Sequence, residues 1–237
     1  MESQEELKLK KAKGFDLLYE VSRAISSNRY LEEILSLIVG MTAELMGSKI
    51  CSLMLLDEKK QELVIKATQS LSENYRTKPP IKVGESVSGR AVQKKEPITV
   101  LDVTQEAGYK YPGIARAEGL KSLISVPMMV RSRVIGVLNC YTANEHQFTE
   151  EEVQLLVGVA NQAAVAIENT NLLAEKIAAA ETLETRRRVE RAKGILMKRQ
   201  SVNESEAYRM LQKQSMNKRK SLKEIADAVI LSDEVVN

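Results

Sequence analysis

The chain has 237 residues and a formal net charge of +3, and 43% of its residues are hydrophobic and 28% charged. This composition is ordinary for a globular protein, and five prolines and eleven glycines exclude collagen-like and low-complexity chains. No apolar run approaches the length of a membrane-spanning helix, and the first residues lack the apolar core of a signal peptide. Two cysteines and one histidine form neither a disulfide framework nor a multi-histidine metal site. We therefore expect a cytoplasmic protein with reduced thiols, no metal and no cofactor.

The charge is distributed unevenly along the chain. Residues 186–237 carry 13 Lys and Arg against 7 Asp and Glu, whereas the rest of the chain carries 22 against 25. A basic tail on a mildly acidic body is a weak sign of a nucleic-acid partner. A solvated helical surface would explain the same charges equally well.

The first third of the sequence predicts two helices and a hairpin. Apolar residues recur at helical spacing over residues 5–27 and again over 30–46. In the first of these helices the apolar residues are Phe15, Leu18, Val21 and Ile25. Short apolar stretches at 49–56 and 62–67 predict a β-hairpin, and the polar segment 68–85 predicts a loop.

The next segment predicts further strands. We expect a short helix over residues 86–94, a strand over 97–101 and a long loop over 102–120. Strands over 122–130 and 134–142 form a second hairpin. The segment is therefore an antiparallel sheet with helices at both ends, an α+β arrangement. No glycine-rich phosphate-binding motif is present in the sequence.

A long helix follows, beginning at the capping box formed by Thr149 and Glu152. Over residues 150–199 it would span about 75 Å, which is too long for one small domain to cover. Apolar and small residues recur along it with alternating spacings of four and three, typical of a coiled coil. This seam consists of Val159, Ala163, Ala166, Thr170, Leu173, Ile177 and Ala180. It predicts a parallel homodimer; the alternative is one helix packed on its own sheet.

The basic tail predicts three helices. The first ends near Arg199, the second begins at an N-cap on Asn203 with Glu206 three residues on, and the third begins at Ser221 with Glu224. These helices predict a small three-helix bundle, which gains stability from its fusion to the long helix.

Five motifs follow one another in the tail over about 50 residues. They are Ala192-Lys-Gly-Ile-Leu-Met197, Glu206-Ala-Tyr208, Leu211, Ser215-Met216 and Leu222-Lys-Glu-Ile-Ala226. In these motifs, and in their order and spacing, the tail resembles an ANTAR domain. Ser201 departs from the family, which usually has glycine there. The resemblance implies RNA binding and transcription antitermination, in which a dimer binds paired RNA hairpin loops and so prevents a terminator from forming.

The front of the chain contains four short motifs in a fixed order: Gly84-Glu-Ser-Val-Ser-Gly89, Asp102-Val103, Val126-Pro127 and Val134-Ile-Gly-Val-Leu138. In these features it resembles a GAF domain, a module that binds small molecules or mediates dimerisation. The resemblance implies a GAF-like sensor over 1–168, a helical stalk over 169–185 and an ANTAR-like domain over 186–237. The known ligand signatures are missing, because neither a cyclic-nucleotide motif nor a bilin or sulfoxide-reductase cysteine is present. Haem could use only His146, for which we expect a surface role instead.

Basic and polar residues of the tail are the candidate RNA contacts. Arginine both stacks on bases and donates hydrogen bonds to their edges, and lysine neutralises phosphates. The candidates are Lys193, Gly194, Lys198, Arg199, Arg209, Asn217, Lys218, Arg219 and Lys220. Gly194 interrupts a helix, so we expect close contact there, either with another helix or with RNA backbone. Tyr208 is expected either in the core or stacked on a base.

In the front domain the candidate ligand contacts are Tyr75, Tyr109 and Tyr111, which lie in the two long loops. The alternative is that these loop tyrosines only cover the sheet and contact no ligand. Cys51 and Cys140 lie in predicted strands, where we expect small buried hydrophobic side chains.

Together these features predict a signal-responsive, homodimeric RNA-binding regulator with a small-molecule effector and no membrane contact. The alternative is a DNA-binding regulator with a helix-turn-helix tail. An enzyme is disfavoured, because no nucleophile with a paired base and no cofactor loop is present.

Overall fold

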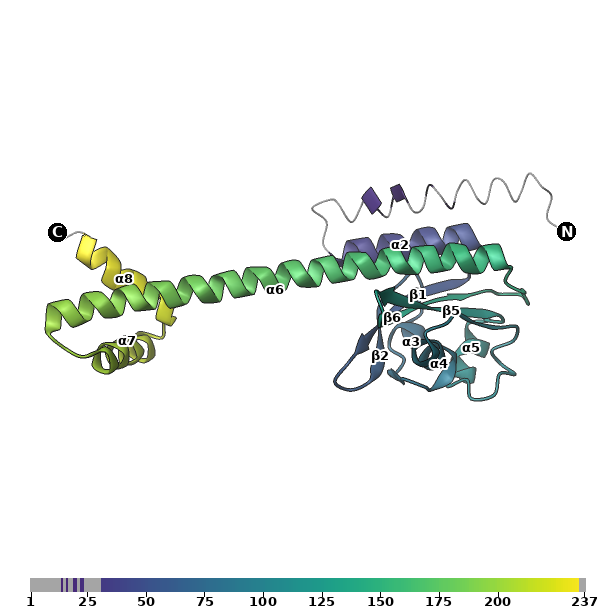
Figure 1. Ribbon diagram of the computed structural model, residues 1–237. Coiled ribbons are helices and arrows are strands. Elements are labelled where there is room, and N and C mark those ends of the chain that lie inside the picture. Colours follow the sequence, from purple (N-terminus) through teal and green to yellow (C-terminus); the bar gives the residue numbers. More distant parts are fainter. Residues whose placement is uncertain (1–13, 15, 17–18, 21, 24–30, 235–237) are drawn as a thin grey trace. The chain divides into compact units, whose positions relative to one another are not determined.

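The computed structural model describes residues 14, 16, 19, 20, 22, 23 and 31–234. The chain divides into two compact units, Met1–Thr170 and Asn171–Asn237, and each is described by itself (Figure 1). Most of the helix expected over 5–27 lies outside the described residues, and so do its four apolar residues, Phe15, Leu18, Val21 and Ile25.

The first unit is built on an antiparallel sheet with the strand order β3-β2-β1-β6-β5-β4. Its strands are β1 (Ile50–Asp57), β2 (Glu62–Thr68), β3 (Ile81–Lys82), β4 (Ile98–Val100), β5 (Leu123–Val130) and β6 (Arg133–Tyr141). Both predicted hairpins are present, as β1–β2 and β5–β6. Strand β3 lies inside the segment expected to be a loop, where two residues pair with the start of β2.

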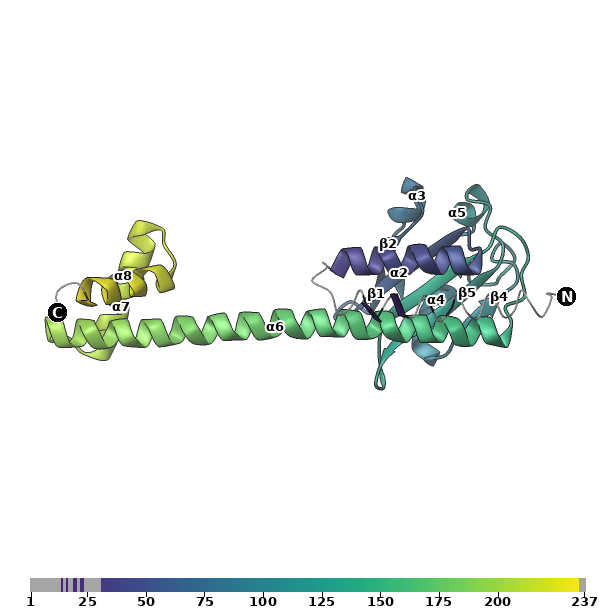
Figure 2. The same ribbon diagram turned by 90° about the horizontal axis from the view of Figure 1, so that it is seen from above.

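Helices cover the two faces of this sheet (Figures 1 and 2). On one face lie α2 (Leu31–Met46) and the beginning of α6 (Glu150–Gln200), which form the largest core cluster. On the other face lie α3 (Glu73–Arg76), α4 (Ser86–Lys94) and α5 (Pro112–Ala117). Successive side chains of a strand point to opposite faces, so Leu53 packs under α2 and α6 while Met54 packs under α4. The α+β architecture expected for this segment is confirmed.

The predicted helix start at Thr149 has the capping box that the sequence indicates. The Glu152 backbone N–H donates to Thr149 Oγ1 at 3.2 Å, and the Thr149 N–H donates to the Glu152 carboxylate at 2.9 Å. The same carboxylate lies 2.8 Å from His146 Nε2. His146 is therefore a partly exposed polar residue next to the helix start, as expected.

The coiled-coil seam predicted along α6 is not one continuous surface. Val159, Ala163 and Ala166 are buried in the core of the first unit, against α2 and the sheet. A side chain enclosed by its own domain cannot pack against a second chain, so these three residues do not belong to a dimer seam. Beyond them, Leu173 is 58% exposed and Ile177 is 52% exposed. The buried alanines agree with the alternative, in which one helix packs on its own sheet. An exposed stretch of α6 begins at residue 171.

The second unit contains the end of α6, α7 (Glu204–Lys218) and α8 (Leu222–Glu234). Its core consists of Val189, Ala192, Leu211, Ile225, Ala226 and Ile230. Both predicted capping boxes are present: Asn203 with Glu206, and Ser221 with Glu224. The three-helix arrangement expected for the tail is confirmed.

Helix α6 ends at Gln200, and Ser201 follows it with a φ of 53°. A left-handed backbone costs a residue with a side chain about 1 kcal/mol or more, whereas glycine adopts it freely. We predict that Ser201→Gly stabilises the second unit by about 1 kcal/mol. Native-state hydrogen exchange of α7 and α8 amides, followed by mass spectrometry, measures the change.

Ser205→Gly is the matched control, because Ser205 lies in the first turn of α7 with helical geometry. There the same chemical change should lower stability by about 0.5 kcal/mol. Equal effects of the two substitutions would contradict the argument from backbone conformation.

The two cysteines face each other across neighbouring strands. Cys51 of β1 is the register partner of Cys140 of β6, and their sulfurs lie 3.4 Å apart. Both side chains are fully buried, as expected, and burial raises the pKa of the Cys51 thiol. Because the thiolate is the reactive form, Cys51 is protected both by packing and by protonation, and Cys140 is protected by packing.

We predict that neither thiol reacts with an aromatic disulfide reagent in the folded protein at pH 8, whereas both react after unfolding. Ser205→Cys provides a positive control, because residue 205 is exposed on α7. Reaction of native Cys51 or Cys140 as fast as the control cysteine would show that this core opens readily.

Candidate nucleic-acid interface and sensor pocket

A rigid basic turn joins α7 to α8. Arg219 ends α7 with a left-handed φ of 51°, and its backbone N–H donates to the Met216 carbonyl. The Lys220 N–H donates to the Ser215 carbonyl, and Ser215 Oγ donates back to the Lys220 carbonyl at 2.6 Å. These bonds fix the backbone that carries Lys218, Arg219 and Lys220.

The side chains of this basic turn point into solvent. Asn217, Lys218, Arg219 and Lys220 are all exposed, although Asn217 and Lys218 belong to the last turn of α7 rather than to a loop. Within the described part of the chain, none of the three cations is paired with a carboxylate. Their positive charge is therefore available to an anionic partner.

Two of the candidate cations instead form ion pairs inside the second unit. Lys193 is buried and lies 2.8 Å from Glu190 and 2.7 Å from Glu204, which joins α6 to α7. These carboxylates raise the pKa of Lys193 and keep it charged. Arg199 pairs with Asp233 at 2.7 Å, which joins α6 to α8. Lys193 and Arg199 are thus neutralised within the unit.

Four other residues considered for RNA contact lie on the surface. Lys198 and Arg209 are exposed, and neither is paired among the described residues. Tyr208 is 38% exposed and lies outside the core cluster. Gly194 is exposed too, and a Cβ built on it would meet no atom within 4 Å. Packing against a helix of this unit therefore does not explain the glycine.

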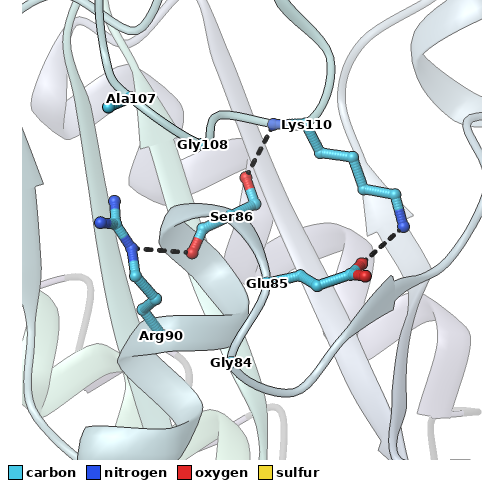
Figure 3. Close-up of a pocket in the computed structure, with 7 residues that line it drawn as sticks. All are labelled: Gly84, Glu85, Ser86, Arg90, Ala107, Gly108 and Lys110. Atoms are coloured by element: carbon cyan, nitrogen blue, oxygen red, sulfur yellow. Dashed lines mark hydrogen bonds and ion pairs between the residues drawn. The ribbon is translucent and has the colours of Figure 1, made fainter.

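The first unit contains a cavity of about 400 Å³ at the beginning of α4 (Figure 3). It is lined by Gly84, Glu85, Ser86, Arg90, Ala107, Gly108 and Lys110. The Lys110 backbone N–H donates to Ser86 Oγ, and Arg90 Nε donates to the Ser86 carbonyl at 3.0 Å. Lys110 pairs with Glu85 at 2.7 Å and Arg90 pairs with Glu106, so the cations of this cavity are already balanced.

The candidate tyrosines do not line this cavity. Tyr75 is buried, and its ring meets Tyr141 edge-on with centroids 6.0 Å apart. Tyr109 joins the same cluster, because its hydroxyl donates to that of Tyr141 at 3.3 Å. Tyr111 lies apart and donates to the Pro79 carbonyl at 2.8 Å. The structure therefore brings two of the three candidates together, around a tyrosine that the sequence analysis did not single out.

A row of buried polar residues crosses the sheet beneath α4. Ser52, Asn139 and Ser125 are register partners on β1, β6 and β5. Ser88 of α4 and Ser125 both donate to Asn139 Oδ1, at 2.8 and 2.6 Å. Asn139 Nδ2 is buried and has no hydrogen-bond partner among the described residues. Only the pairing of the strands aligns these residues, so single-strand patterns could not have found them.

Within the part of the chain that the structure describes, no cluster of three or more His, Cys, Asp or Glu side chains could hold a metal ion. None of its helices combines the length and apolar character needed to cross a membrane.

Comparison with known proteins supports the assignment of both units. The sequence profile of the GAF domain matches residues 28–168, and that of the ANTAR domain matches residues 178–230. A transcriptional regulatory protein, PdtaR of Mycobacterium tuberculosis, is 38% identical over 63 residues, which cover 27% of this chain and 31% of that protein.

The front of the chain has relatives of a different kind. A protein of the phosphoenolpyruvate-dependent phosphotransferase system of Escherichia coli is 26% identical over 157 residues, or 66% of this chain. This chain spans about a fifth (21%) of that relative's length.

Solved structures give the same picture of the fold. The GAF domain of a Coxiella burnetii phosphoenolpyruvate-protein phosphotransferase has a TM-score of 0.63 and 25% identity, covering 69% of this chain and 98% of that one. The free methionine-R-sulfoxide reductase of Neisseria meningitidis has a TM-score of 0.59 and 22% identity, covering 68% and 91%. The chain therefore belongs to the GAF domain family, and an ANTAR domain follows its GAF domain.

Proposed function

We propose that this chain is a regulator of transcription antitermination whose ANTAR domain binds RNA hairpin loops as a homodimer, in response to a signal received by the GAF domain. The observation that carries the proposal is the rigid basic turn, which presents three unpaired cations on an ANTAR unit. The similarity to PdtaR, a transcriptional regulatory protein, supports the regulatory part.

The proposed RNA surface comprises the basic turn and the neighbouring exposed residues of the second unit. Its members are Gly194, Lys198, Arg209, Asn217, Lys218, Arg219 and Lys220. Lysines and arginines bind phosphates, and arginine also recognises the unstacked bases of RNA loops. The open space around Gly194 fits the close approach of an RNA backbone. Lys193 and Arg199 act indirectly, by holding α7 and α8 against α6.

The proposed dimer contact lies on the exposed middle of α6. Among the described residues, Leu172, Leu173, Ile177 and Leu183 each expose more than half of their surface. Apolar side chains at this spacing on a helix gain about 25 cal/mol per Å² when a partner covers them. The remaining seam residues Thr170, Leu173, Ile177 and Ala180 are the ones that we propose to pack in the dimer.

A DNA-binding tail remains the second candidate. It is less well supported, because the last helix of the tail, α8, contains none of the Gln, Asn and Arg side chains that read base edges in the major groove. We propose no catalytic activity for the chain.

Neutralising the basic turn should weaken RNA binding. In the variant Lys218→Gln, Arg219→Gln, Lys220→Gln each lost phosphate contact lowers the slope of log affinity against log salt by about 0.7–0.9. We expect the slope to fall by about 2 in gel-shift titrations with a two-hairpin RNA. The control variant Lys59→Gln, Lys60→Gln, Lys66→Gln removes three exposed lysines of the GAF domain.

An unchanged slope in the basic-turn variant would show that the turn is only a solvated surface. A loss of slope that also occurs in the control would indicate a general charge effect. Duplex DNA of the same sequence distinguishes the two candidate functions: tighter binding to the duplex than to the RNA would favour the DNA-binding tail.

Charges placed on the proposed dimer contact should separate the subunits. We expect Leu173→Glu, Ile177→Glu to shift the light-scattering mass towards the 26.5 kDa of one chain. The control Ala178→Glu, Thr182→Glu adds two charges with the same spacing to the opposite side of the same exposed stretch and should leave the mass unchanged. A dimer that survives the first pair would place the contact elsewhere in the chain.

A further inference from the structure

The ammonium group of Lys78 lies against a cluster of tyrosines in the GAF domain. Its Nζ is 4.0 Å from the centroid of the Tyr75 ring and 5.9 Å from that of Tyr141. The π face of a tyrosine ring carries partial negative charge and attracts cations within about 6 Å. Lys78 therefore makes a cation–π contact with two rings at once.

The tyrosines are held in place as the walls of a cage. The planes of Tyr75 and Tyr141 stand at 85° to each other, so their surfaces meet at a corner. The Tyr75 hydroxyl shares a hydrogen bond with Ser52 Oγ at 2.9 Å, and Tyr109 donates to Tyr141. Tyr75 and Tyr141 are almost completely buried. The cage is thus organised by the sheet and by hydrogen bonds, independently of the cation it holds.

Lys78 is a poorly compensated occupant of this cage. Lys110 and Lys121 of the same domain each pair with a carboxylate, whereas Lys78 pairs with none among the described residues. Removal from water lowers the pKa of Lys78 to about 7. A lysine that swings out recovers its hydration, so the cage can release it at little cost.

The backbone around Lys78 is fixed, so release would involve the side chain alone. The next two residues are Pro79 and Pro80, whose φ angles are restricted by their rings. The Tyr111 hydroxyl donates to the Pro79 carbonyl, and Lys110 Nζ donates to the Pro80 carbonyl at 3.1 Å. Lys78 itself is partly exposed, which leaves its side chain a short path to solvent.

We propose that Tyr75 and Tyr141, with Tyr109 hydrogen-bonded behind Tyr141, form a binding site for an organic ammonium ion, and that Lys78 is a tethered occupant which the ligand displaces. A methylated ammonium fits this chemistry best, because it carries a permanent charge and is weakly hydrated. It therefore loses less hydration free energy than lysine does on entering an aromatic cage. The inference deepens the sensing role proposed above, and it depends on that role only for an effect on RNA binding.

The direct test follows Lys78 in the full-length wild-type protein. An amine-acylating reagent, with mass spectrometry, should modify Lys78 slowly in the free protein and several-fold faster when tetramethylammonium is present. Lys59 is the internal control, because it is exposed in the β1–β2 turn and should react equally in both conditions. Unchanged labelling of Lys78 at saturating tetramethylammonium would overturn displacement.

Calorimetry with tetramethylammonium tests the site itself. Lys78→Ala empties the cage and should bind about tenfold tighter than the wild type, whereas the control Lys59→Ala should bind like it. Tyr75→Phe keeps the ring and should retain binding, and Tyr75→Leu should lose it. If Tyr75→Leu fails to fold, Lys78→Ala and the labelling experiment still test the proposal. Tetramethylammonium binding by Lys78→Ala that is no tighter than that of the wild type would overturn it.

The pH dependence separates displacement from simple binding. Above about pH 7 the caged Lys78 is neutral, whereas a released lysine stays charged to about pH 10. Displacement then takes up a proton, so wild-type affinity should fall by up to about tenfold per pH unit between pH 7 and 9.

Neither the two tyrosines that Lys78 contacts nor Tyr109, which is hydrogen-bonded to Tyr141, titrates in this pH range. Tyr75, Tyr109 and Tyr141 all have raised pKa values, because burial disfavours their phenolates. Lys78→Ala should therefore show no such slope, and a slope retained in that variant would overturn the assignment. RNA binding is measured separately, so its absence would refute the proposed function without touching the cage.

Discussion

One continuous helix constrains the whole chain. Helix α6 contributes the buried side chains between Leu156 and Ile167 to the core of the GAF domain. It also contributes Val189 and Ala192 to the core of the ANTAR domain. Between these two cores every residue from 171 to 184 is exposed. Neither core can be built without this helix, and among the described residues the stretch between them has no buried apolar side chain. The proposed dimer uses this exposed stretch of α6.

The ANTAR unit divides its positive charges into two groups. Lys193 and Arg199 lie where α6 meets the other two helices, and carboxylates of α7 and α8 neutralise them. The basic turn carries cations that the described chain leaves unpaired. An ion pair on a surface contributes at most about 1 kcal/mol to stability, whereas cations without an ion-pair partner remain available to phosphate. The partly buried pairs orient the helices, and the unpaired cations are free to bind.

The GAF domain likewise separates structure from binding by the faces of its sheet. The face under α2 and α6 is apolar and contains both cysteines. The opposite face carries the buried serine and asparagine row and the tyrosine cage. Asn139 Nδ2 remains without a partner there among the described residues, and an unsatisfied buried donor costs about 1–3 kcal/mol. Burying these polar groups and the caged Lys78 on one face of the sheet lowers the stability of the fold. The same groups are suited to recognising a ligand.

The sequence by itself determined the order of the longer elements and the identity of both domains, whereas α3 and β3 lie in a segment expected to be a loop. Apolar stretches predicted the hairpins, and capping boxes at Thr149, Asn203 and Ser221 marked three helix starts. These signals are local, because each depends on residues within a few positions of one another. The ANTAR motifs identified the tail through their order and spacing over about 50 residues.

Only the tertiary structure decided which partner each side chain has. The repeat from Val159 to Ala180 looks uniform along the chain, yet its first three residues belong to the domain core, because a helical stripe does not specify what covers it. Lys193 looked like a phosphate contact until Glu204 of another helix was placed beside it. Lys78 lies 63 positions from Tyr141 in the chain, and strand pairing together with loop packing brings them together. Long-range contacts of this kind leave no periodicity in the sequence, so the cage could be found only in the fold.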